Sequence, residues 1–136
     1  MYTISFWPIL VSAVVAFVIG ALWYSPVLFG KEWMGYLASR RGGAAGSASG
    51  MWQRYLVQIV MTLIMFVIMG FAVSASGSTG TADGALVGFL AWLGFMLPTA
   101  VTNVLWKEEP FKISLIETVN NLVILVIGGA IIGAWH

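Results

Sequence analysis

The fold is decided by residues 113–135, which read ISLIETVNNLVILVIGGAIIGAW. A helix needs about 20 apolar residues to cross roughly 30 Å of hydrocarbon, and this run is long enough. It also contains an acid embedded among apolar residues, Glu117, with Asn120 and Asn121 three and four residues further on. These offsets place the three side chains on one face of a helix. An ionisable group in a membrane span is costly, so we interpret Glu117 as a candidate functional residue.

The composition is that of a membrane protein. The chain has 136 residues, of which 60% are hydrophobic and only 8% charged, whereas soluble domains average about 25% charged residues. Residues 31–41, KEWMGYLASRR, mix aromatic and basic side chains and predict a short helix along the membrane interface. The sequence therefore predicts an all-α membrane protein. We expect one four-helix domain, residues 1–136, with spans at 4–23, 52–74, 84–106 and 113–135 and a flexible linker at 42–50.

The distribution of basic residues predicts the orientation. The loops after the first and third spans share one side of the membrane. Together with the span ends beside them, they hold all six lysines and arginines: Lys31, Arg40, Arg41, Arg54, Lys107 and Lys112. By the positive-inside rule, both basic loops are cytoplasmic and both termini are outside.

Small residues spaced four apart predict where helices pack closely. Pro98 should also kink the third span, because its ring frees the carbonyl of Gly94. Since three spans carry small-residue faces, we expect a homo-oligomer. The predicted helix-packing residues are Ala16, Gly20, Gly84, Gly88, Gly129 and Gly133.

Polar side chains occur at matching depths in several spans, as judged from about 1.5 Å of rise per helical residue. All lie in the cytoplasmic half, and the last span is apolar from residue 122 to its closing tryptophan. This asymmetry predicts an inward-facing polar pocket closed by an apolar plug, and it disfavours a continuous pore. The alternative is that these groups bond neighbouring helices together, or that Glu117 pairs with Lys112 or Lys107. The predicted pocket residues are Glu117, Asn120, Asn121, Asn103, Thr99, Gln58, Thr62, Tyr24 and Ser25.

Several functional classes are disfavoured by what the chain contains. It has no cysteine, and its one histidine is His136, so we predict no metal site and no cofactor. A net charge of +1 predicts no nucleic-acid partner. We assign no catalytic residues, because a nucleophile and a base cannot be paired; an enzyme would need a cofactor or partner to supply the base.

Three segments resemble one family: WYSPVLFGKEWM (23–34), DGALVGFLAWLGFMLPTAVTN (83–103) and the acid near the start of the last span. They are similar to small bacterial membrane proteins catalogued as domain-of-unknown-function family 1761. The resemblance implies four spans, a multi-pass protein of the bacterial cytoplasmic (inner) membrane, and no established activity. Members often have Asp and His where Glu117 and Asn121 stand here, which puts histidine-dependent chemistry in doubt. The patterned positions are Trp23, Tyr24, Ser25, Pro26, Phe29, Gly30, Trp33, Pro98, Thr99, Asn103 and Glu117.

The leading functional hypothesis is a small binding or transport protein with an inward-facing pocket around Glu117. Its partners would be the lipid bilayer, further copies of the chain and a small polar or amphipathic ligand. The alternative is a structural or accessory membrane subunit that acts by packing its helices against protein or lipid partners.

Overall fold

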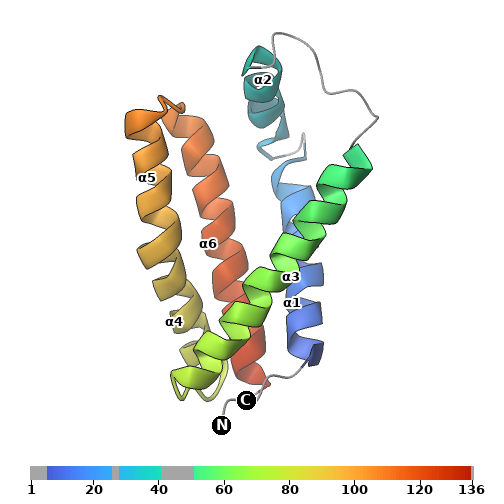
Figure 1. The fold of residues 1–136 in the computed structure, drawn as a ribbon, viewed down its shortest axis with the longest axis vertical. Coiled ribbons are helices and arrows are strands. Elements are labelled where there is room, and N and C mark those ends of the chain that lie inside the picture. Colours follow the sequence, from blue (N-terminus) through green and yellow to red (C-terminus); the bar gives the residue numbers. More distant parts are fainter. Residues whose placement is uncertain (1–5, 26–27, 41–50, 136) are drawn as a thin grey trace.

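The computed structural model describes residues 6–25, 28–40 and 51–135, and every regular element in these ranges is a helix (Figure 1). The elements are α1 (Phe6–Trp23), α2 (Gly30–Arg40), α3 (Met51–Ala75), α4 (Thr81–Ala91), the π-helical turn η1 (Trp92–Met96), α5 (Leu97–Trp106) and α6 (Phe111–Ala134). Four helical segments are long and apolar enough to span a membrane: Phe6–Trp23, Trp52–Ala75, Thr81–Trp106 and Phe111–Ala134.

These segments confirm the prediction of an all-α protein with four membrane-spanning helices. The short helix expected over residues 31–41 is present as α2. The predicted linker at residues 42–50 lies outside the described residues. A single domain, and the side of the membrane on which each loop lies, stay predictions.

The helix α6 is the centre of the bundle. Figure 1 shows it between the α4–α5 segment and α1, with α3 crossing the bundle obliquely. Its buried residues extend along its whole length, from Ile113 to Gly133. The span that carries Glu117 is therefore also the one that the other helices pack against.

Glycines allow α4 and α6 to pack with their backbones in contact. A Cβ atom added to Gly84 would collide with the carbonyl oxygen of Gly129, and one on Gly129 would collide with that of Gly84. At the end of this contact the N–H of Gly80 donates to the carbonyl of Gly133 at 3.1 Å. The two predicted glycine motifs thus face each other inside one chain.

The small residues of α1 pack against the other face of α6 over most of its length. Ser12 and Ala16 are buried, and the Ser12 hydroxyl lies 3.4 Å from the carbonyl oxygen of Gly128. Phe66 of α3 covers the same glycine. Gly20, by contrast, has no atom within 4 Å of a Cβ built on it. Because most small-residue faces are occupied within one copy, they no longer support the predicted homo-oligomer, which stays a prediction.

The third span is interrupted one turn before its proline. The π-helical turn η1 ends with the N–H of Leu97 donating to the carbonyl of Trp92, and Pro98 follows in the first turn of α5. A proline ring cannot follow the tight α-helical path over the carbonyl four residues earlier, here that of Gly94. A widened turn accommodates it, which is a usual origin of π-helical insertions within α-helices.

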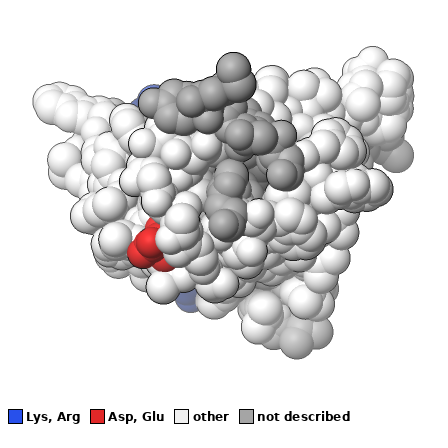
Figure 2. Space-filling view, turned by 90° about the horizontal axis from the view of Figure 1, so that it is seen from below, with Lys and Arg blue, Asp and Glu red and all other residues white. Residues whose placement is uncertain are grey.

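Charged side chains are concentrated at one end of the bundle. Lys31 lies in α2, Arg54 in the first turn of α3, and Lys107 and Lys112 flank the α5–α6 turn. We call this the basic end; it is at the top of Figure 1. Figure 2 looks onto the opposite end, where the visible described surface is mostly uncharged, with a small acidic patch and small basic areas at the edges of the view.

Candidate functional site

A tight turn after α1 brings α2 back over the start of α6. The N–H of Gly30 donates to the carbonyl of Ser25 at 2.8 Å, and the N–H of Phe29 donates to that of Trp23 at 3.1 Å. A Cβ on Gly30 would collide with the backbone carbonyl of Tyr24. Only glycine fits here, so the Phe-Gly pair is explained by the geometry of the turn.

The turn carries two aromatic pairs. The rings of Trp23 and Phe29 lie with centroids 5.0 Å apart, and those of Tyr24 and Trp33 lie 4.6 Å apart. The Trp23 indole N–H also donates to the backbone carbonyl of Ile116 in α6 at 2.9 Å. This bond attaches the turn to the helix just before Glu117.

Glu117 lies half-buried beneath this aromatic turn. Its carboxylate accepts a long hydrogen bond, 3.3 Å, from the indole N–H of Trp33. Lys112, a candidate ion-pair partner, instead contacts Glu32 of α2 at 2.7 Å. Within the described residues no lysine or arginine forms an ion pair with Glu117.

A second acid, Glu109, completes the site from the loop before α6. Its carboxylate lies close enough for its negative charge to act on Glu117. Two neighbouring carboxylates repel each other when both are ionised. The pair is therefore a place at the basic end of the bundle where added positive charge is favoured.

Tyr24 is influenced electrostatically by the same carboxylate. Burial first, and the negative charge of Glu117 second, raise the pKa of Tyr24 from 10.0 to about 12. The phenol therefore stays neutral at ordinary pH, and its ring is held against that of Trp33.

Four other predicted pocket residues bond within their own segments. The Gln58 amide donates to the Thr62 hydroxyl at 3.2 Å, and that hydroxyl donates to the Gln58 carbonyl at 2.8 Å. The Thr99 hydroxyl is exposed and donates to the carbonyl four residues back at 2.8 Å. The Ser25 hydroxyl donates to the carbonyl three residues back at 2.7 Å. Among the predicted pocket residues, Tyr24 lies close enough to Glu117 for an electrostatic interaction. The hydrogen bonds described for Gln58, Thr62 and Thr99 do not involve Glu117.

The three predicted asparagines differ in environment. Asn103 is half-buried near the end of α5, where its backbone carbonyl accepts from the N–H groups of Lys107 and Glu109. Asn121 is half-buried on α6. Asn120 is buried, and its side-chain oxygen has no partner among the described residues.

Sequence reasoning from depth missed Trp33 and Glu109. Trp33 was assigned to an interfacial segment, although the family resemblance marked it as a patterned position. Glu109 lies in a charged loop, and the one signal beside it is Pro110, the N-cap residue of α6. Within the described residues no three acids or histidines come together as a metal site. The chemistry available is that of a carboxylate pair beside aromatic rings.

Comparison with known proteins gives one match. The model of a family described as "Protein of unknown function (DUF1761)" matches residues 7–133. No curated protein and no solved structure matches the chain.

Proposed function

Because the chain belongs to the DUF1761 family of proteins of unknown function, its family supplies no activity, and we propose that this membrane protein binds a small amphipathic cation at Glu117 in exchange for a proton. In this proposal it is a binding or transport protein of the cytoplasmic membrane, with the basic end in the cytoplasm. In this proposal the site also opens toward that end, which the close glycine packing of α4 against α6 nearer the other end supports.

The observation that carries the proposal is a carboxylate in a membrane span next to two aromatic rings. Glu117 receives one long hydrogen bond from Trp33, while Lys112, five residues earlier, is engaged with Glu32. A charge at this depth needs compensation. A quaternary ammonium group satisfies both surroundings, because it is attracted by the carboxylate and by the faces of Trp and Tyr rings.

Proton exchange follows from the second carboxyl group. In this proposal one proton lies between the carboxyl groups of Glu109 and Glu117 in the empty site, since two neighbouring ionised carboxylates repel each other. A bound cation would take over the role of that proton and displace it, since both neutralise the same charge. In this proposal binding therefore releases a proton.

The test is calorimetric titration of the purified full chain in detergent with benzyltrimethylammonium. We expect Glu117→Gln to weaken binding at least tenfold, because the buried counter-charge is lost. The matched control is Glu108→Gln, an equal charge change at an exposed residue at the same end. Neopentylbenzene, the uncharged analogue of the probe, should bind equally weakly to native protein and both variants.

If native protein and the Glu117→Gln variant bind the cation with equal affinity, that result contradicts the proposal. Absence of binding across a panel of organic cations would favour the alternative function, a structural or accessory subunit. If the protein has that function, Glu117→Gln should leave the properties of the native assembly unchanged in every assay.

A further inference from the structure

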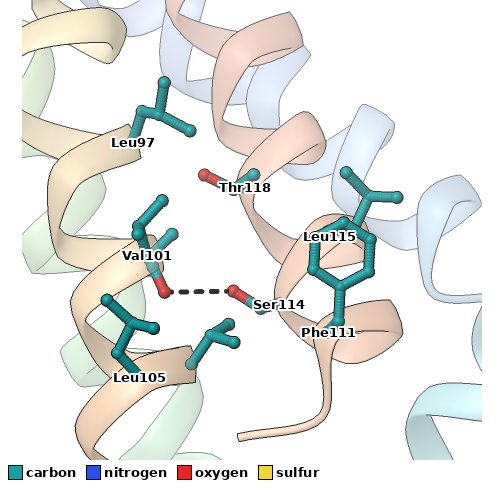
Figure 3. A pocket seen from close by; sticks show the side chains of 9 residues that line it. Leu97, Val101, Leu105, Phe111, Ser114, Leu115 and Thr118 are labelled. Atoms are coloured by element: carbon teal, nitrogen blue, oxygen red, sulfur yellow. Dashed lines mark hydrogen bonds between the residues drawn. The ribbon is translucent and has the colours of Figure 1, made fainter.

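An apolar groove lies between α5 and α6 (Figure 3). Its volume is about 180 Å³, and seven of its nine lining residues are apolar, Leu97, Val101 and Leu105 among them. Ser114 and Thr118 of α6 supply the two hydroxyl groups. The groove is separate from the Glu117 site, because successive helical residues point about 100° apart around the axis.

Thr118 is the residue that makes this groove more than a packing defect. Its side chain is buried, with 7% of the residue exposed, and its hydroxyl has no hydrogen-bond partner among the described residues. Figure 3 shows that hydroxyl directed from α6 toward α5. Ser114, one turn away, bonds to the carbonyl of Ala100 at 3.4 Å. A buried hydroxyl without a partner is costly, so an occupant that bonds to Thr118 is favoured.

The surrounding helices hold the groove open. The indole N–H of Trp92 donates to the backbone carbonyl of Thr118 at 2.8 Å, which fixes η1 against α6. The π-helical turn and Pro98 then redirect α5 as it leaves this contact. The groove lies next to that contact, between α5 and α6.

We propose that the groove binds a small neutral molecule that is mostly apolar and carries one hydroxyl or carbonyl group, hydrogen-bonded to Thr118. Its size matches this class, since an apolar cavity of about 150 Å³ holds a molecule as large as benzene. A lipid acyl chain would fill the walls and leave Thr118 unpaired. A water molecule would need two to four polar partners, and the apolar walls provide few.

The experiment compares benzyl alcohol with ethylbenzene, an apolar molecule of similar size, on the full chain in detergent. Binding is followed through the methyl NMR signals of Leu97, Val101 and Leu105, and each affinity is corrected for partition of the probe into detergent. We expect native protein to prefer benzyl alcohol about five- to tenfold, as one buried hydrogen bond provides. Thr118→Val should abolish the preference while ethylbenzene still binds.

Two variants keep the test decisive. Thr118→Ser retains a hydroxyl and should retain the preference. Thr102→Val makes the same change at an exposed position of α5 and should leave binding as in native protein. Equal affinity of native protein for both probes, a preference that survives Thr118→Val, or groove methyl signals that respond to neither probe would overturn the proposal. Glu117→Gln should keep the preference, so failure of the cation site leaves this result standing.

Discussion

Glu117 and Thr118 are neighbours in the chain but belong to different sites. The carboxylate of Glu117 meets α2 through Trp33, whereas the side chain of Thr118 lines the groove beside α5. A helix presents consecutive residues to different neighbours, so one turn of α6 serves two surfaces.

At the same scale, Tyr24 gives a prediction about pH. Its pKa of about 12 in the folded protein exceeds the ordinary value of 10.0, so between these values the folded state keeps a proton that the unfolded chain has lost. Its contribution to stability is therefore complete below pH 10 and is lost as the pH rises through about 12. Titration of tyrosinate absorbance should show one late step that Tyr24→Phe removes.

The cause of the shift can be tested separately. Glu117→Gln should lower the pKa of Tyr24 by removing a nearby negative charge, while Glu108→Gln should leave it unchanged. Burial is the larger cause, so the pKa should stay above 10 in the variant. A Tyr24 phenol that ionises near pH 10 in native protein would contradict the described packing.

At the scale of elements, the contact between α4 and α6 yields the clearest stability prediction. A Cβ on Gly88 would collide with the carbonyl oxygen of Leu125, with the carbonyl carbon at 2.6 Å. Gly88→Ala should therefore lower the free energy of unfolding by about 1–3 kcal/mol, the usual cost of overpacking. Unfolding in mixed micelles measures it.

The matched control is Gly20→Ala in α1, where a Cβ meets nothing within 4 Å. There the substitution should be neutral or stabilising by up to about 1 kcal/mol, because alanine favours a helix over glycine. If Gly88→Ala leaves the single chain stable and instead dissociates an oligomer, the glycine motif acts between copies, as the sequence alone suggested.

The whole molecule gives a prediction about orientation. The chain has no cysteine, so single cysteines placed at exposed loop positions report accessibility without background. In intact bacterial cells, Thr79→Cys should react with a membrane-impermeant maleimide, and Glu108→Cys should react only after permeabilisation. These outcomes follow from the basic end being cytoplasmic, and the reverse labelling pattern would contradict it.

The four spans could be predicted from the sequence because a bilayer leaves few choices. Backbone groups in hydrocarbon must bond within their own segment, so a long uncharged run must be helical. Segment ends were less certain: the third span begins at Thr81, before the predicted residue 84, and it breaks at η1 before Pro98. A helix can extend into a short polar loop wherever its backbone hydrogen bonds can form. Hydropathy therefore predicts helix ends only approximately.

The candidate site could be predicted only in part. Depth along a helix specifies only how far a residue lies along the membrane normal, and not which way it faces: Gln58 is exposed, whereas Thr62 one turn later is buried. Residues 52–61 of α3 are all exposed, because α3 crosses the bundle obliquely and its first turns leave the other helices (Figure 1). The direction in which a side chain faces depends on how the helices cross, and hydropathy gives no information about the crossing angles.

The sequence by itself therefore determined the number of spans, the segregation of charge and the isolated acid, since each follows from the free energy of transferring single residues into a bilayer. The tertiary structure determined which side chains contact each other. It brought Trp33 to Glu117 across 84 positions of the chain, engaged Lys112 with Glu32, and left the Thr118 hydroxyl unpaired in an apolar groove. These outcomes depend on which backbones pack closely and which side chains then meet, and that is a property of the whole bundle.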